Sequence, residues 1–412
     1  MRFSEKRGKE ALARKERLFY NENMDVIERL ASIRQDVQTE VAEDVRMVPS
    51  AGRGAPAPCE DPAEGLPITM AALPNGQRMP ILKTLLTSAC ERNCYYCPFR
   101  SGRDLRRVTF QPDELAGAIV RLTERGVIRG AFLSSGIAGG GIRTQDRLIA
   151  TAEILRHKFH YRGYLHLKLM PGAEYDQVLR AMQLADRVSV NLEGANPRRL
   201  EALAPQKVFM EELLQPLRWV EEIRRKLPPV QGWQGRWPSS TTQFVVGAVG
   251  ESDLELLATV SYLNKTVRLA RGYFSGFSPT PGTPFEGLPP CNPWREHRLY
   301  QASFLLRDYG FELEELPFQE GGQLPLDVDP KLSWAKQNLA EAPIEVNRAG
   351  RQELLRIPGI GPRGAQAILK ARRQTRLRSL EDLWALGVVT TRAAPFILLD
   401  GHRPAVQPTL WG

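Results

Sequence analysis

Short apolar runs alternate with amphipathic stretches through the middle of the chain. Six of the runs are typical of strands, at residues 81–88, 130–136, 163–170, 187–193, 241–249 and 272–277. The stretches between them place apolar residues at helical spacing, at residues 111–126, 144–159, 174–185, 210–227 and 251–264. A regular alternation of strands and helices predicts an α/β fold with a parallel sheet and right-handed crossovers.

Two of the predicted strands carry polar side chains on one face only. Leucines occupy positions 165, 167 and 169, whereas His166 and Lys168 belong to the opposite face. Polar residues at 189, 191 and 193 alternate with apolar ones in the same way. Polar groups on the inner face of a parallel sheet are costly unless something polar fills the space beside them. A partial (βα)6 barrel of the TIM type, with a polar lumen and a bound ligand, explains the pattern. Buried polar pairs within the protein are the alternative.

Composition divides the chain into three predicted domains. Residues 1–77 form a helical extension followed by a linker rich in Pro, Gly and Ala. Residues 78–342 form the α/β core with an extension, and residues 343–412 form a small all-α domain. The first twenty residues lack the apolar segment of a signal peptide, and no stretch is apolar enough to span a bilayer. We therefore expect a cytoplasmic protein without a membrane anchor.

Positive charge is concentrated towards the end of the chain. The formal net charge is +9, and residues 343–412 hold eleven Lys and Arg against five Asp and Glu, a net +6. Such an excess favours a polyanionic partner, although a solvated basic surface gives the same count.

Three of the five cysteines fall within the stretch CERNCYYC, at residues 90–97. The Cys90-x3-Cys94-x2-Cys97 spacing follows the first predicted strand, at the end of the barrel where such folds place active sites. Three thiolates can bind three irons of a [4Fe-4S] cluster and leave the fourth iron open to another ligand. A structural zinc site needs a fourth Cys or His, and none follows within a turn or two. The spacing therefore predicts an iron–sulfur centre.

At this stretch the sequence resembles the radical S-adenosylmethionine (SAM) superfamily, whose signature is Cys-x3-Cys-x-aromatic-Cys. The resemblance implies that SAM binds the open iron, and that an electron from a flavodoxin- or ferredoxin-type donor cleaves SAM to a 5′-deoxyadenosyl radical. It also implies roles for residues near the strand ends. These are Tyr96 against the adenine, Ser134, Ser135 and Gly136 at the methionine amino group, Asn191 and Glu193 at the ribose, and Gly247 and Glu251 in a loosely matched adenine motif.

One strand-end motif and one further cysteine leave part of the site assignment open. The superfamily's Gly-Gly-Glu motif is replaced here by Ser134-Ser135-Gly136, which leaves the side-chain roles at that strand end open. Cys291 follows the last predicted strand, where a thiol could return a hydrogen atom to the product. An ordinary packed cysteine is the alternative.

The C-terminal domain has the pattern of helix, Pro-Gly-Ile-Gly turn and helix at residues 345–373, with a weaker second copy at 379–398. Gly359 and Gly361 permit a tight turn, and the amides that begin the next helix can face a phosphate. Arg356, Arg363 and Lys370 can add charged contacts, which bind the nucleic-acid backbone rather than the bases. The pattern resembles the tandem helix-hairpin-helix domains of DNA-binding and repair proteins, and a protein-binding module is the alternative.

Residues 295–311 and 324–335 extend the resemblance to one family. Its members are regarded as DNA modification or repair radical SAM proteins with a C-terminal helix-hairpin-helix, and they are associated with a uracil-DNA-glycosylase-like protein. The expected function is radical modification or repair of DNA, with that protein as a partner. RNA modification and a DNA-bound iron–sulfur adaptor that recruits a glycosylase are the alternatives.

Overall fold

The computed structural model of the protein describes residues 26–34, 65–72 and 78–404. The chain divides into two compact units, of which unit 1 is Met1–Val249 with Lys265–Cys291 and unit 2 is Gly250–Asn264 with Asn292–Gly412. The predicted boundary between residues 342 and 343 falls inside unit 2. Most of the predicted N-terminal extension, Cys59 included, lies outside the described residues.

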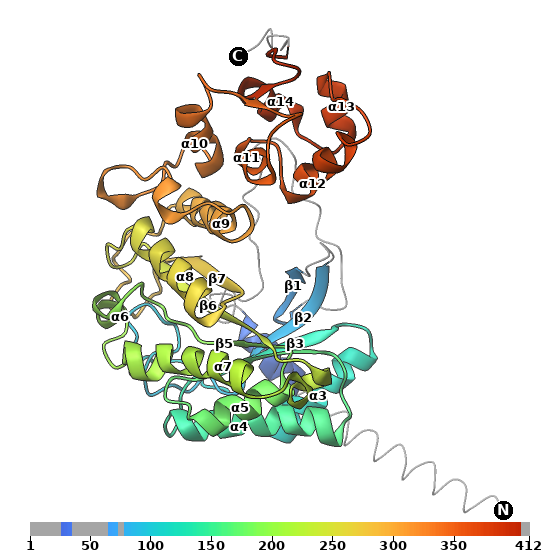
Figure 1. Ribbon diagram of the computed structural model, residues 1–412. Coiled ribbons are helices and arrows are strands. Elements are labelled where there is room, and N and C mark those ends of the chain that lie inside the picture. Colours follow the sequence, from blue (N-terminus) through green and yellow to red (C-terminus); the bar gives the residue numbers. More distant parts are fainter. Residues whose placement is uncertain (1–25, 35–64, 73–77, 405–412) are drawn as a thin grey trace, which may run out of the picture. The chain divides into compact units, whose positions relative to one another are not determined.

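Unit 1 is built on a curled sheet whose seven strands follow the order of the chain (Figure 1). The strands are β1 (Ile68–Ala72), β2 (Arg78–Leu85), β3 (Gly130–Ser134), β4 (Tyr164–Lys168), β5 (Arg187–Ser189), β6 (Ser239–Val246) and β7 (Arg271–Gly276). Strands β2 to β7 are parallel, and they are the six strands that the sequence predicts. The partial barrel of the TIM type is therefore confirmed. The antiparallel edge strand β1 was not predicted.

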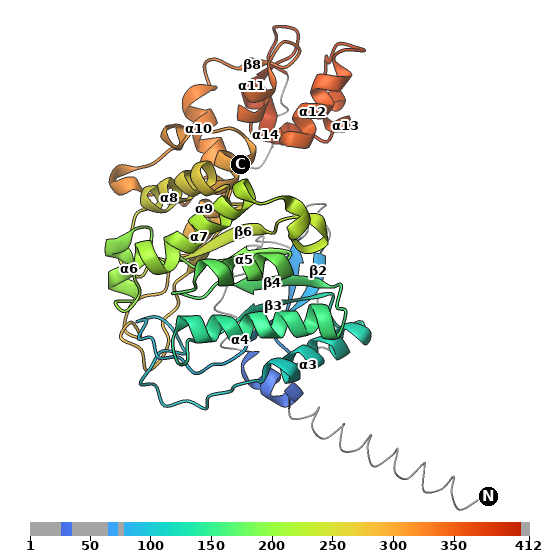
Figure 2. The same ribbon diagram turned by 60° about the horizontal axis from the view of Figure 1, so that its bottom comes forward.

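Helices connect the parallel strands and cover one face of the sheet. In unit 1 they are α3 (Pro112–Glu124), α4 (Gly141–Glu153), α5 (Tyr175–Leu184), α6 (Pro197–Leu203) and α7 (Gln215–Lys226), with the turns η1 (Ile154–Lys158), η2 (Phe209–Leu214), η3 (Pro229–Gln231) and η4 (Trp233–Gly235). The helix between β6 and β7, α8 (Asp253–Val267), belongs mostly to unit 2. Helices α3, α4, α5 and α7 lie side by side (Figure 2). The leucines at 165, 167 and 169 are fully buried beneath the helices. The polar residues that alternate with them in β4 therefore face the concave side of the sheet.

A buried arginine closes the amino ends of β4 and β5. The side chain of Arg156 is fully buried and pairs with Asp186 at 3.0 Å. Its guanidinium also donates to the carbonyls of Tyr161, Gly163 and Leu184, and lies 3.9 Å from the centre of the Trp233 ring. One cation therefore joins the loops before both strands to the segment that precedes β6.

Unit 2 is mainly helical. Besides most of α8, its elements are α9 (Pro293–Asp308), α10 (Pro330–Asn338), α11 (Arg351–Arg356), α12 (Pro362–Ala371), α13 (Leu380–Ala385) and α14 (Thr390–Ala393), with the turns η5 (Leu313–Glu315), η6 (Glu320–Gly322) and η7 (Ala394–Phe396) and the strands β8 (Ile344–Glu345) and β9 (Ile397–Leu398). Two-residue strands differ from the expected all-α domain. They form because the ends of the two helical hairpins pair, as in the bond from the Val346 amide to the Leu398 carbonyl.

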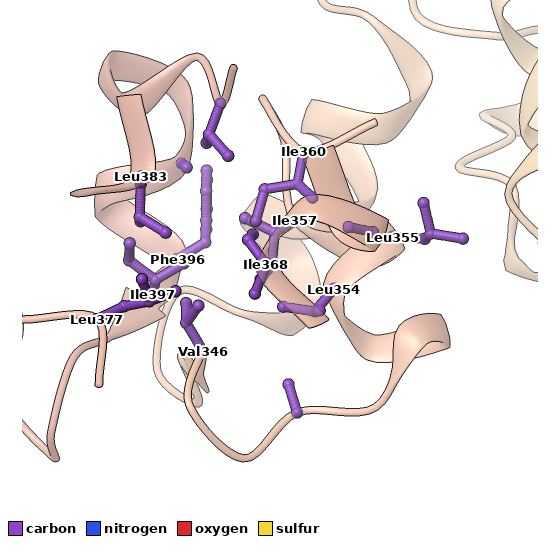
Figure 3. Close-up of a cluster of buried hydrophobic side chains, with 14 of the residues drawn as sticks. Val346, Leu354, Leu355, Ile357, Ile360, Ile368, Leu377, Leu383, Phe396 and Ile397 are labelled. Carbon is purple, nitrogen blue, oxygen red and sulfur yellow. The ribbon is translucent and has the colours of Figure 1, made fainter. Parts of the chain in front are cut away.

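The two helical hairpins share one apolar core. Ile357, Ile360 and Ile368 of the first hairpin pack with Leu383 and Phe396 of the second (Figure 3). At the first turn Gly359 has φ +85°, and an added Cβ would lie 2.3 Å from the Val389 carbonyl oxygen. The turn therefore requires glycine, both for its left-handed conformation and for the close approach of the second hairpin.

We predict that Arg156→Met lowers the free energy of unfolding of unit 1 by about 3–5 kcal/mol, because it leaves the Asp186 carboxylate buried without this cation. Urea denaturation followed by circular dichroism measures the change. Lys158→Met is the control, since Lys158 pairs with Asp113 on the surface, where both side chains are more than half exposed. Equal stability of the two variants would contradict the prediction.

Candidate cofactor site at the carboxyl ends of the strands

A single pocket in unit 1 brings the three clustered cysteines together with the ends of the strands. Its empty volume, open solvent included, is about 840 Å³. The residues that line it are Leu85, Cys90, Arg92, Cys94, Tyr96, Cys97, Phe99, Ser134, Ser135, Gly136, Ile137, Lys168, Leu169, Met170, Pro171, Asn191, Glu193, Lys207 and Gln243. Apart from Lys207, which lies between α6 and η2, they come from the end of β2 and the loop after it, and from the carboxyl-terminal parts of β3, β4, β5 and β6 or the segments that follow them. This is the edge where parallel α/β folds bind their ligands.

A close backbone contact holds the cysteine loop on the sheet. The Gly136 amide donates to the Thr87 carbonyl at 2.7 Å, and a Cβ added at Gly136 would lie 2.3 Å from the Ala89 carbonyl oxygen. The Glu91 carboxylate accepts from the amides of Gly139 and Gly140. The glycines after β3 therefore allow this segment to approach the loop that carries the cysteines.

Each cysteine sulfur lies in a different environment. The Ile137 amide donates to Cys90 Sγ at 3.5 Å, and the Phe99 amide donates to Cys97. Burial raises the pKa of the Cys94 thiol, which Lys207 partly offsets, and burial raises the pKa of Cys97 to about 12. Both thiols therefore keep their protons near neutrality unless a metal displaces them.

A buried ion pair lies beside the thiols. Lys207 Nζ donates to Glu193 Oε1 at 3.2 Å, and the two side chains are only 10% and 6% exposed. Burial acts to lower the pKa of Lys207, but Cys94 and then Glu193 together raise it well above its usual value. Burial, followed by the charge of Glu193, raises the pKa of Tyr96, whose hydroxyl donates to the Glu193 carboxylate.

The structure brings most of the residues selected from the sequence into this pocket and leaves three outside it. Tyr96, Asn191, Glu193 and residues 134–136 line it with the cysteines. Gly247 and Cys291 do not; they pack against each other, since a Cβ on Gly247 would lie 3.0 Å from Cys291 Sγ. Glu251 belongs to unit 2, where it pairs with Arg295 at 3.3 Å. The ligand roles assigned to all of these residues stay predictions.

Sequence analysis gave no role to four polar residues that line the pocket, Arg92, Lys168, Lys207 and Gln243. Arg92 lies within the cysteine stretch, and Lys168 had a signal because it alternates with the leucines of β4, whereas Gln243 follows two threonines in β6 without such alternation. Lys207 had none, since it lies in the irregular segment between α6 and η2 and reaches the pocket only through the tertiary fold.

Comparison with known proteins identifies the class of this domain. Residues 84–262 match the family described as the radical SAM superfamily, so the chain contains a radical SAM superfamily domain. No curated protein matches the chain significantly.

Solved structures with a related fold include the FeFe-hydrogenase maturase HydG from Carboxydothermus hydrogenoformans, at 16% identity over 55% of this chain and 51% of that chain (TM-score 0.43). Methylornithine synthase PylB is 14% identical over 55% of this chain and 61% of that chain (TM-score 0.44). The methyltransferase TsrM from Kitasatospora setae is 16% identical over 50% and 38% (TM-score 0.37). The aligned region thus spans less than two thirds of each of these proteins.

The cofactors of the superfamily are a [4Fe-4S] cluster and SAM, and the donor set of the pocket fits both. Within the described ranges no three His, Cys, Asp or Glu side chains converge tightly enough to hold a single metal ion. The three cysteines instead line the same pocket, as a cluster requires when each thiolate binds a different iron. The Ser134 hydroxyl is buried without a hydrogen-bond partner among the described residues, as expected of a side chain that awaits a polar ligand. Among those residues, no helix combines the length and the apolar character needed to cross a bilayer.

We predict that anaerobic reconstitution gives about four irons and four sulfides per chain, and that Cys90→Ala, Cys94→Ala or Cys97→Ala each abolishes the cluster. Iron and sulfide analysis with absorption spectroscopy measures the content. Cys291→Ala is the matched control, since Cys291 does not line the pocket. A complete cluster in Cys94→Ala would contradict the assignment of the ligands.

Proposed function

We propose that the protein is a radical SAM enzyme that modifies or repairs DNA. The observation that carries the catalytic part is the pocket that joins the three cysteine sulfurs to the polar strand ends of the half-barrel. The observation that favours a nucleic-acid substrate is the basic pair of helical hairpins in unit 2.

The pocket supplies the groups that this chemistry needs. Cys90, Cys94 and Cys97 would hold the cluster, and Tyr96 with the polar strand ends would hold SAM. When both are bound, they supply a carbon-centred radical that abstracts a hydrogen atom from the substrate. The apolar wall formed by Leu85, Phe99 and Met170 excludes water and so protects a reactive intermediate from side reactions.

The first hairpin turn of unit 2 lines a second pocket, whose charged lining residues are Lys331, Arg392 and Asp329. Gly359, Ile360 and Gly361 line it together with Lys331 of α10 and Arg392 of α14. Lys331 Nζ donates to the Ile360 carbonyl at 2.6 Å, and Arg392 pairs with Asp329. Burial, then the charge of Arg392, lowers the pKa of Lys331 to about 7. An approaching phosphate would favour the charged form of this lysine, which supports backbone binding at the turn.

The basic side chains predicted to bind nucleic acid differ in whether they are already paired within unit 2. Arg356 donates to both oxygens of Glu315 and stacks 3.8 Å from the Phe311 ring centre, so its charge is already paired within unit 2. Arg363 and Lys370 are exposed on α12. The contact with a phosphate backbone is therefore proposed for Arg363, beside the turn, and for Lys370, in the last turn of α12, rather than for Arg356.

We predict that the reduced, anaerobic protein converts SAM to methionine and 5′-deoxyadenosine, which chromatography with mass spectrometry detects. Cys94→Ala, which loses a cluster ligand, is expected to form neither product. Loaded wild-type protein that forms no 5′-deoxyadenosine, with or without nucleic acid, would overturn the enzymatic function and favour an adaptor that recruits a glycosylase.

We predict that Arg363→Ala combined with Lys370→Ala weakens binding to duplex DNA and reduces the log–log salt slope by up to about 1.8, because each phosphate that the protein neutralises contributes about 0.9 to that slope. Fluorescence anisotropy over a salt series measures both quantities. The control replaces Lys158 and Lys226, two exposed lysines of unit 1, by Ala.

The same titration decides between the partners. Duplex DNA bound more tightly than single-stranded DNA and tRNA at one salt concentration supports the proposed substrate, and tighter binding of tRNA would favour RNA modification. An unchanged slope in the double variant, equal to that of the control, would remove the hairpins from the nucleic-acid interface.

A further inference from the structure

The three cluster thiols of the pocket are not electrostatically equivalent. The Cys90 sulfur accepts from the Ile137 amide, in the segment after β3, whereas Cys97 accepts from the Phe99 amide of its own loop and Cys94 from its own amide. Cys94 is the most buried of the three, and the strongest opposing influence on its thiol pKa after burial is the Lys207 ammonium. A formal positive charge therefore lies within the low-dielectric surroundings of the cysteine loop.

The Lys207–Glu193 pair lies in the same pocket as the sulfurs, and the bond from the Asn93 amide to Gln206 Oε1 at 3.2 Å holds the segment that carries Lys207 against the cysteine loop. Two opposite charges at 3.2 Å form a dipole, and the sign of its field depends on which end is nearer. At Cys94 the ammonium affects the thiol pKa more than the carboxylate does, and Lys207 also acts to lower the pKa of Cys97, although less strongly than the neighbouring thiols raise it. Both effects have the sign expected when the positive end of the pair is the nearer one.

The backbone holds Glu193 in the position that orients this dipole. Glu193 has φ +62°, an uncommon conformation for a residue other than glycine. Its amide donates to the Gln243 carbonyl at 2.9 Å and its carbonyl accepts from the Val245 amide at 2.8 Å, which fixes it against β6. The Tyr96 hydroxyl donates to the same carboxylate, so the loop between Cys94 and Cys97 is linked to Lys207 through Glu193.

We propose that Lys207 is the charge-compensating residue of the iron–sulfur cluster, and that Glu193 and Tyr96 are positioning residues that aim its ammonium at the thiolates. Reduction adds one negative charge to a cluster that already carries three thiolates. A nearby buried cation stabilises the reduced form more than the oxidised one and so raises the reduction potential. The inference rests on the proposed function, because it requires that the cysteines hold a cluster.

Reduction potentials of the reconstituted full-length protein test the proposal. An anaerobic redox titration without SAM, followed by the electron paramagnetic resonance signal of the reduced cluster, is made on wild type, Lys207→Met, Lys207→Arg and Glu193→Gln. Lys207→Met is expected to disfavour reduction at least tenfold, which is 59 mV for one electron. Lys207→Arg keeps the charge and is expected to stay closer to wild type. Glu193→Gln removes the negative end of the dipole and is expected to shift the potential upwards.

The reduction potentials of Lys207→Met and Glu193→Gln are expected to shift in opposite directions, and this distinguishes charge compensation from a structural role. Damage to the pocket would move Lys207→Met and Glu193→Gln in the same direction, and that result, or unchanged potentials in both, would overturn the proposal. Lys158→Met removes the same charge from the surface and is expected to leave the potential unchanged. If Lys207→Met fails to load a cluster, Lys207→Arg and Glu193→Gln still test the proposal. The reduction potential of Glu193→Gln is then expected to lie above that of Lys207→Arg, which keeps both charges. A wild-type protein that binds no cluster would instead refute the proposed function itself.

Discussion

The close approach between Gly136 and the Ala89 carbonyl positions the cysteine loop and the pocket of unit 1. Ala89 directly precedes the first cysteine, and Gly136 follows the end of β3 within two residues. No side chain fits at that contact, so the cysteine loop lies directly on the strand ends instead of extending into solvent. The sulfurs therefore share one pocket with the polar residues that end β3, β4 and β5. A change of one residue at this contact would displace the loop that carries the cysteines and the wall that faces them.

The parallel sheet was predictable because the two sequence patterns that indicate it depend only on residues close together in the chain. Alternation in β4 and β5 separates the helix-covered face from the lumen, and apolar periodicity gives the intervening helices. The cysteine loop was also predictable, since its spacing is a covalent property of the chain. Lys207 was not, because its position depends on how the segment after α6 folds back over the loop. The two compact units were not predicted, because the assignment of α8 and α9 to one unit depends on tertiary packing, which composition does not reveal.

The buried charges of the pocket are more readily explained by chemistry than by stability. Burying an ion pair usually costs more in desolvation than its attraction returns, and an apolar pair of the same volume often serves the fold as well. Arg156 with Asp186 meets that cost through hydrogen bonds to backbone carbonyls and a stacked ring, which together close the amino ends of two strands. The side chains of the Lys207–Glu193 pair have fewer such partners, chiefly each other and the Tyr96 hydroxyl, and the pair lies beside three sulfurs. A charge whose cost is not repaid by packing is expected where a reaction needs its field.

Under the proposed function, the two units would contribute differently to the recognition of a nucleic acid. Contacts from Arg363 and Lys370 to phosphates would be equal for every sequence, so they could hold a nucleic acid but not select a target. Selection must then come from the pocket, whose walls combine apolar residues such as Leu85 and Met170 with Ser134, Asn191 and Gln243. A base inside a duplex cannot reach such walls unless it leaves the stack, and unstacking costs least at damaged or unpaired positions. Under the proposed function, the ease with which a nucleotide leaves the helix would therefore contribute to specificity before any atom of the pocket contacts it.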